Sequence, residues 1–299
     1  MALALAPAGC TRPGAAPSIP TDPRPLVLAT TAPLTLFTRA LAGSCARVEP
    51  LLPPGGDPHQ AQVRPADLLR LRRAALLVEN GLGLEAELSL EPLLRSGAAP
   101  DLRRVDSSRG IATLPSGGLS VPNPHIWLDP LRARQQGITI AAALHAAIPG
   151  CRDGLPARQA RLEAQLRDLD LELRHQLTPV RGRTVLGLHD LGAYFAERYG
   201  LRLTSLMPPG GGEHQAPGPG DLQRIGSLAR QHQLRGILVE PGASAGLDGI
   251  LQDLGLRALP FDPIETLDPE APPGLEPYLR RQRANAAAVL ASLAPLPAP

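Results

Sequence analysis

The sequence contains no lysine, so every basic side chain apart from histidine is an arginine. The formal net charge is only +2, and the arginines alternate with acidic residues, for example between Arg158 and Arg174. No stretch combines clustered basic residues with interleaved aromatics, which is the usual pattern of a nucleic-acid-binding surface. The composition therefore argues against a nucleic-acid partner and favours solvated helix faces of mixed charge.

Aromatic residues are also scarce, at 2% of the 299 residues. Hydrophobic cores must then be built from leucine, alanine and valine, and a chain of this length can form two such cores or one large one. Proline (35 residues) and glycine (30 residues) are abundant, but they are scattered between apolar runs and form no repeat. This pattern excludes a collagen-like chain and indicates a folded protein with many turns.

The apolar run at the N-terminus is too short to span a bilayer, and it lacks the basic start of a complete secretory signal. The segment Leu5-Ala-Pro-Ala-Gly-Cys10 nevertheless resembles the end of a bacterial lipoprotein signal, in which small residues precede a lipidated cysteine. We expect residues 1–24 to be a signal remnant and flexible tether, with Cys10 as a candidate lipid anchor. The alternative is a disordered tail with an incidental cysteine.

The two other cysteines, Cys45 and Cys151, are far apart in the sequence. They could pair in an exported protein, but their spacing alone does not predict a disulfide.

Short apolar runs alternate with helical segments along the rest of the chain. Buried strands are expected at residues 25–30, 46–52, 74–78, 184–188, 202–206, 236–240 and 257–261. Helices are expected at 34–42, from 65 onward, and at 84–96, 130–148, 191–199, 220–232, 244–254 and 274–293. This alternation is typical of βα units that form a parallel sheet.

One longer helix separates the two series of βα units. Residues 157–177 contain no glycine or proline, and their leucines recur every three or four residues between charged and amide side chains. Such a helix is about 30 Å long. The predicted fold is α/β, with two lobes built on parallel sheets at residues 25–150 and 180–299 and a linking helix within 151–179.

The stretch Asn123-Pro-His-Ile-Trp-Leu-Asp-Pro130 holds the only tryptophan and a histidine with prolines on both sides. The prolines restrict the backbone, so the imidazole of His125 can point in few directions. Asp129 followed by Pro130 is a good helix start, with the aspartate as N-cap. We assign Trp127 to packing behind the histidine. A single histidine of this kind is more often structural than functional, so its role depends on partners elsewhere in the chain.

Three further residues are candidates for such partners. His59 follows the second expected strand, and His189 and Asp262 each end a strand of the second lobe. In open parallel sheets, ligands bind at the carboxyl ends of the strands. Three imidazoles and one carboxylate suit Zn²⁺, whereas Mn²⁺ prefers more oxygen ligands. The sequence therefore predicts a metal site made of His59, His125, His189 and Asp262.

Five motifs in order resemble those of one known family. They are Asp57-Pro-His-Gln-Ala-Gln-Val-Arg-Pro-Ala-Asp67, Val78-Glu-Asn-Gly-Leu-Gly-Leu-Glu85, Pro124-His-Ile-Trp-Leu-Asp-Pro130, His189-Asp-Leu-Gly-Ala-Tyr-Phe195 with Tyr199-Gly200, and Phe261-Asp-Pro263. From about residue 24 to 293 the chain is similar to the zinc/manganese substrate-binding proteins (cluster A-I type) of bacterial metal-uptake ABC transporters. The resemblance implies two Rossmann-like lobes joined by a rigid backbone helix, with the metal ion between the lobes.

The same resemblance places His59, His125, His189 and Asp262 on the four ligand positions of the family. Members associated with manganese tend to carry glutamate at the position of His189, so the histidine favours Zn²⁺ over Mn²⁺. The resemblance further implies a monomer, in the periplasm or at the outer face of the cytoplasmic membrane, that delivers metal to a membrane permease. Many zinc-binding members carry a histidine-rich loop before the third motif, but residues 107–123 contain no histidine.

Two other functions compete with this one. A zinc hydrolase could use three histidines and a water molecule, but a catalytic zinc ion keeps one position open, and Asp262 would close it. The chain also lacks the His-Glu-x-x-His motif of zinc proteases. A binding protein for a metal chelate would keep the fold but would leave the four predicted ligands without a role.

Overall fold

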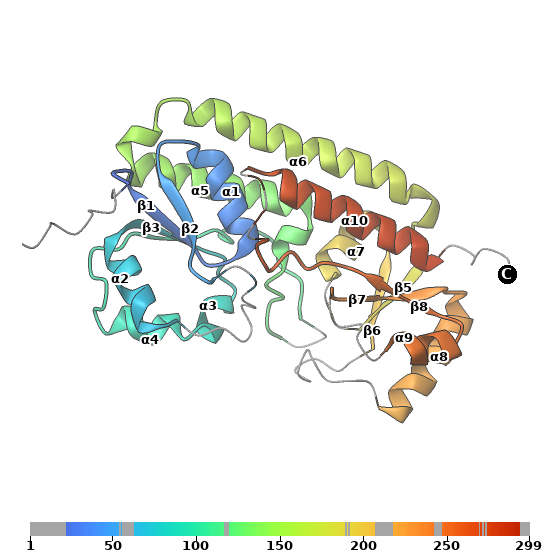
Figure 1. The fold of residues 1–299 in the computed structure, drawn as a ribbon. Coiled ribbons are helices and arrows are strands. Elements are labelled where there is room, and N and C mark those ends of the chain that lie inside the picture. The colour runs from blue at the N-terminus through green and yellow to red at the C-terminus, as the bar shows by residue number, and fades with distance from the viewer. Residues whose placement is uncertain are drawn as a thin grey trace, which may run out of the picture.

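The computed structural model describes residues 22–53, 55, 63–116, 120–188, 190, 192–206, 218–241, 247–268, 270, 272 and 274–293. Over these ranges the chain forms two four-stranded parallel sheets, each with its own helices, and the two lobes lie side by side beneath one long helix (Figure 1). This arrangement confirms the predicted fold class. No helix in these ranges is long and apolar enough to cross a lipid bilayer.

The first sheet has the strand order β2-β1-β3-β4, and all its pairings are parallel. Its strands are β1 (Leu26–Ala29), β2 (Arg47–Pro50), β3 (Ala74–Glu79) and β4 (Arg104–Asp106). The helices of this lobe are α1 (Ala32–Ala42), α2 (Pro65–Arg73), α3 (Leu84–Glu87), α4 (Leu90–Arg95) and α5 (Pro130–Ala147). Every residue of β1 is buried, as its continuous apolar run predicts for a strand covered on both faces.

The second sheet repeats this topology with the order β6-β5-β7-β8, again with parallel pairings. Its strands are β5 (Thr184–Gly187), β6 (Arg202–Ser205), β7 (Gly236–Val239) and β8 (Arg257–Pro260). The helices of this lobe are α7 (Ala193–Tyr199), α8 (Pro219–His232), α9 (Asp248–Asp253) and α10 (Glu276–Leu293).

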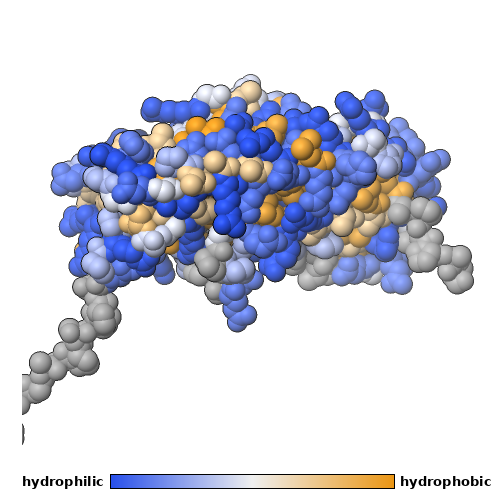
Figure 2. Space-filling model, turned by 90° about the horizontal axis from the view of Figure 1, so that it is seen from above, coloured by the Kyte–Doolittle hydropathy of each residue, from blue (hydrophilic) through white to orange (hydrophobic). Residues whose placement is uncertain are grey.

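The linking helix α6 (Leu155–Leu177) has 23 residues and is about 34 Å long. It packs against α1 and α5 of the first lobe and against α7 and α10 of the second (Figure 1). Its leucines at the predicted spacing are buried: Leu162, Leu166, Leu169, Leu173 and Leu177. The molecular surface seen from the side of α6 is mostly hydrophilic, with separate hydrophobic patches (Figure 2). The buried leucines of α6 thus pack on helices of both lobes, and one hydrophobic cluster runs through the two lobes.

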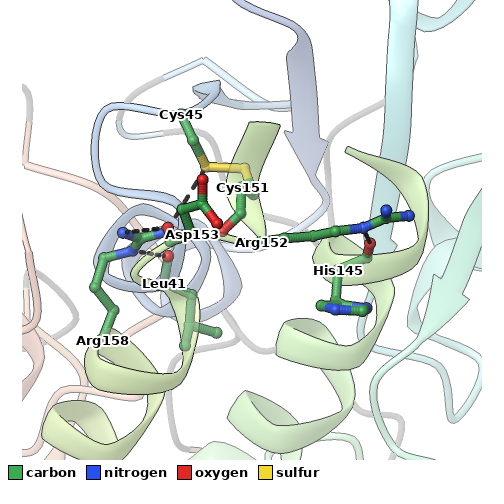
Figure 3. The surroundings of a disulfide bond; sticks show 7 residues. All are labelled: Leu41, Cys45, His145, Cys151, Arg152, Asp153 and Arg158. Carbon is green, nitrogen blue, oxygen red and sulfur yellow. Dashed lines mark hydrogen bonds between the residues drawn. A yellow bond between two sulfur atoms is a disulfide. The ribbon is translucent and has the colours of Figure 1, made fainter. Parts of the chain in front are cut away.

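Cys45 and Cys151 form a disulfide, which their spacing does not predict (Figure 3). Cys45 follows α1, and Cys151 ends the short 3-10 helix η2 (Pro149–Cys151) between α5 and α6. Their Cα atoms are 5.0 Å apart although 106 positions separate them in the sequence. The packing of α1 against α5 and α6 brings the two cysteines together.

Arg158, in the first turns of α6, holds the backbone next to this disulfide (Figure 3). Its guanidinium donates hydrogen bonds to the carbonyl oxygens of Leu41, at 2.6 Å, and Cys151, at 3.2 Å. The Leu41 carbonyl lies in the last turn of α1, where backbone carbonyls have no partner within the helix. The disulfide and Arg158 together tie the end of α1 to the corner between α5 and α6.

The first lobe differs from the predicted elements in two places. The single helix predicted at 84–96 is divided into α3 and α4, because Ser89 between them adopts a left-handed conformation with φ of 55°. Strand β4 is absent from the predicted elements, since its three residues form no apolar run. It nevertheless pairs with β3 and forms the edge of the sheet.

Candidate metal centre

His125 lies in the loop between β4 and α5, directly before the 3-10 helix η1 (Ile126–Leu128). Only 8% of its side-chain surface is exposed. Asp129 caps α5 as predicted: its Oδ1 accepts a hydrogen bond of 2.8 Å from the backbone N–H of Leu131, and Pro130 is the first helical residue. The cap anchors the loop, so His125 is held in a defined position.

Asn123 orients the ring of His125. Its Oδ1 lies 2.9 Å from His125 Nδ1 and 3.0 Å from the His125 backbone nitrogen. The Nδ2 group of Asn123 donates to Asp190 Oδ2 in the second lobe, at 3.3 Å. Because the amide nitrogen faces this carboxylate, the amide oxygen is the atom that accepts from the histidine. Nδ1 of His125 therefore donates to Asn123, and Nε2, on the other side of the ring, is the nitrogen that would coordinate a metal ion.

Trp127 is fully buried and packs edge-on against His125, with the ring centroids 5.3 Å apart. This contact confirms the packing role predicted for it. The indole Nε1 also donates to the carbonyl oxygen of Pro263 in the second lobe, at 2.7 Å. Tyr278 and Gln282 of α10 donate to the Trp127 carbonyl oxygen, at 2.6 and 3.3 Å. The loop that carries His125 is thus bonded to two segments of the second lobe.

Asp262 lies two residues after β8, near the carboxyl end of an edge strand. Asn285 of α10 holds its backbone, since it accepts from Asp262 N at 2.7 Å and donates to Asp262 O at 2.8 Å. The carboxylate accepts a hydrogen bond of 2.7 Å from Ile264 N and lies 3.3 Å from Arg281 Nε. Burial raises the pKa of Asp262 above its ordinary value, and the Arg281 guanidinium opposes this rise.

The structure also brings Glu265 to His125, a contact that no pattern in the sequence predicts. Glu265 Oε1 lies 2.6 Å from His125 Nε2, and each of the two side chains has less than a tenth of its surface exposed. Glu265 stands three residues after Asp262 in the same turn, and this closeness to a predicted ligand is the only signal in the sequence that points to it.

The segment from Val78 to Glu85 forms a buried polar network beside the His125 loop. The Glu85 carboxylate accepts hydrogen bonds from Thr30 Oγ1, at 2.7 Å, and from Asn80 N, at 2.6 Å. The Asn80 side chain in turn donates to the carbonyl oxygen of Pro124, at 3.0 Å. Burial raises the pKa of Glu85 to about 7, against the effect of its hydrogen bonds. This motif therefore supports the loop of His125 through the bond from Asn80 to Pro124.

The other two predicted ligands, His59 and His189, lie outside the residues that the structure describes, as does Cys10. Among the described residues, no group of three or more His, Cys, Asp or Glu side chains is placed to hold a metal ion. The complete four-ligand site stays a prediction, for which the structure supplies the surroundings of His125 and Asp262.

Replacing Asn123 with alanine is expected to lower the affinity for Zn²⁺ by roughly 10- to 100-fold, the usual cost of losing a hydrogen-bond partner of a metal-bound histidine. The ring of His125 would lose the acceptor that holds the hydrogen on Nδ1. Competition with a chromophoric chelator measures the affinity. Gln176→Ala, which removes an amide from an exposed position of α6, is the control and should bind as the native chain does. Equal affinities of the native chain and Asn123→Ala would show that Asn123 does not act on the metal site.

Residues 27–291 match the model of the family described as zinc-uptake complex component A, periplasmic. The high-affinity zinc uptake system protein ZnuA of Yersinia pestis is 28% identical over 259 residues, which cover 78% of this chain and 80% of that protein. The manganese-binding lipoprotein MntA of Halalkalibacterium halodurans is 29% identical over 205 residues, covering 67% of this chain and 65% of that protein. The crystal structure of a zinc-bound deletion mutant of ZnuA has a TM-score of 0.76 at 27% identity, covering 92% of this chain and 100% of the other.

The structural match includes both lobes, and the family match begins in β1 and ends in the last turns of α10. The motifs around His125 and Asp262 lie within it. A match over nearly all of the described fold shows that the chain belongs to the family of periplasmic zinc-uptake component A proteins.

Proposed function

We propose that the protein captures Zn²⁺ between its two lobes and delivers it to the permease of a metal-uptake ABC transporter, with Mn²⁺ as the second candidate cargo. His59, His125, His189 and Asp262 are the proposed ligands. The observation that carries this proposal is the orientation of His125: Asn123 accepts from Nδ1, while Nε2 is turned toward the segment that follows Asp262. An imidazole whose second nitrogen donates to a side-chain oxygen is the usual form of a metal-binding histidine.

The family consists of metal-binding components of uptake systems that work outside the cytoplasmic membrane, and not of enzymes. The hydrolase alternative is therefore not supported. The family's members include ZnuA, which is named for zinc uptake, and MntA, which is named for manganese binding. This chain is similar to both. A histidine at position 189 supports Zn²⁺ as the preferred cargo, because imidazole suits zinc better than manganese.

The contacts between the lobes support release through local movement rather than wide opening. Tyr278 of the second lobe packs edge-on against Phe37 of the first, with ring centroids 5.1 Å apart. Tyr194 donates to the carbonyl oxygen of Asn123 at 2.7 Å, and α6 packs on helices of both lobes. Bending the molecule at α6 would break this shared core, so we expect small shifts of the site loops when the metal leaves.

We further propose residues 25–150 and 180–299 as the metal-binding lobes, 151–179 as the linker and 1–24 as the tether. A lipid on Cys10 would keep the protein close to the permease. A monomer is sufficient for this function, because one chain supplies both lobes of the site.

The test of cargo is the metal content of the purified protein, followed by competition between Zn²⁺ and Mn²⁺. The native chain is expected to retain Zn²⁺. His189→Glu should shift the preference toward Mn²⁺ by roughly tenfold or more, because it replaces an imidazole with a carboxylate oxygen donor. His175→Glu, at an exposed position of α6, is the matched control and should leave the preference unchanged. A native chain that prefers Mn²⁺ would refute the zinc assignment, and one that binds neither ion would refute the proposed function.

A further inference from the structure

The turn after β8, from Asp262 to Glu265, has an unusual backbone conformation. Ile264 is fully buried and has φ of 63°, in the left-handed region that β-branched residues rarely adopt. The surrounding bonds hold this turn: Ile264 N donates to Asp262 Oδ1, and the Pro263 carbonyl accepts from Trp127 Nε1. A costly conformation persists only where neighbouring groups impose it, and such positions are concentrated at functional sites. Here the turn places Glu265 against His125.

The two carboxylates of this turn are engaged differently. Asp262 Oδ1 accepts from Ile264 N, and its Oδ2 lies 3.3 Å from Arg281 Nε. Glu265 directs Oε1 at Nε2 of His125, the nitrogen proposed to coordinate the ion. It is also the more buried of the two, with 9% of its side-chain surface exposed against 25% for Asp262.

The distance between Glu265 and His125 is close to what a shared metal ion requires. Zinc lies about 2.0–2.1 Å from histidine nitrogen and about 2.0–2.2 Å from carboxylate oxygen, so two neighbouring ligands of one ion are about 2.9 Å apart at an angle of about 90° and about 3.3 Å apart at the tetrahedral angle. His125 Nε2 and Glu265 Oε1 are 2.6 Å apart, and a widening of about 0.3–0.7 Å would admit an ion bound by both atoms.

We propose that Glu265 is a carboxylate ligand of the bound ion and that it increases the affinity for Mn²⁺ relative to Zn²⁺. This inference rests on the proposed function. A second carboxylate beside Asp262 makes the ligand set richer in oxygen, and oxygen ligands suit Mn²⁺ better than imidazoles do. Glu265 thus offsets part of the preference for zinc that three histidines provide, and it lets a zinc-type ligand set accept manganese.

The test compares Glu265→Gln with Glu270→Gln, in which an exposed glutamate five positions further along the chain loses the same charge. Both variants and the native chain are stripped of metal by dialysis against a chelator, and their affinities for Zn²⁺ and for Mn²⁺ are measured by chelator competition. Glu265→Gln is expected to bind Mn²⁺ about 100-fold and Zn²⁺ about tenfold more weakly than the native chain. Glu270→Gln should match the native chain for both ions.

A second variant, Glu265→Asp, keeps the charge but withdraws the carboxylate by one methylene. It is expected to weaken Mn²⁺ binding more than Zn²⁺ binding. If the glutamine variant does not fold, this variant tests whether Glu265 binds the ion. Unchanged affinities for both ions in every folded variant at position 265 would overturn the role of Glu265 while leaving the proposed function in place. A native chain that binds neither ion would refute the proposed function and this inference with it.

Discussion

His125→Ala is expected to lower the affinity for Zn²⁺ by roughly 100-fold or more. Structural zinc sites bind with about 10–16 kcal/mol, and a quarter of this, about 3 kcal/mol, corresponds to roughly 100-fold in affinity. His125 is the predicted ligand whose geometry the structure defines most fully, with Nδ1 held by Asn123 and Nε2 facing the second lobe. Its loss would also remove the contact between His125 Nε2 and Glu265 Oε1, so the effect on binding should exceed that of Asn123→Ala.

His145→Ala is the matched control for this experiment, because His145 is exposed in the last turn of α5. It should bind Zn²⁺ like the native chain. The melting temperature of the metal-free His125→Ala protein shows whether the variant is folded, and only a folded variant is compared. Native affinity in folded His125→Ala would exclude His125 as a ligand and would remove the main support for the proposed site.

The second large effect is expected from removing the disulfide between Cys45 and Cys151. The bond closes a loop with a sequence separation of 106, and a loop of about 100 residues corresponds to a stabilisation of about 4.7 kcal/mol in the chain-entropy model. Measured values are often smaller, and we expect the double alanine variant to lose about 3–5 kcal/mol of unfolding free energy. The melting temperature should then fall by roughly 10 °C.

A Cys10→Ser background keeps a third thiol out of this measurement. Reduction of the protein with the intact disulfide should lower its melting temperature to that of the double alanine variant, whose own melting temperature should not respond to reductant. Because the bond lies at the corner between α5 and α6 and not in the His125 loop, Zn²⁺ affinity should change little. Equal stability of the oxidised protein and the double variant would show that the bond does not contribute to the fold.

Local sequence patterns predicted most of the elements in this protein. The apolar run of β1, the leucine spacing of α6 and the Asp129-Pro130 helix start depend on residues within one or two turns of each other. Their predictions are confirmed for that reason. Strand β4 was missed because three residues without an apolar run form a strand only when β3 lies beside them.

The candidate site was predictable where its residues have distinctive neighbours. His125 stands between prolines, and Asp262 ends an apolar strand segment, so both could be singled out without a structure. Glu265 has no such context, since a glutamate in a polar turn has the same local pattern as an exposed one. Its contact with His125 spans 140 positions of the sequence, and the φ angle of Ile264 helps to create it.

Local patterns in the sequence are enough to specify the α/β class, the two series of βα units, the long helix between them, and His125 and Asp262 as candidate ligands. Three other features depend on the folding of the whole chain: the pairing of Cys45 with Cys151, the bond from Trp127 to Pro263 and the position of Glu265. The two groups of features differ in the sequence range of the interactions that create them. Periodicity and capping act within a few residues, whereas these three contacts exist only after α6 and the shared hydrophobic core have brought distant segments together.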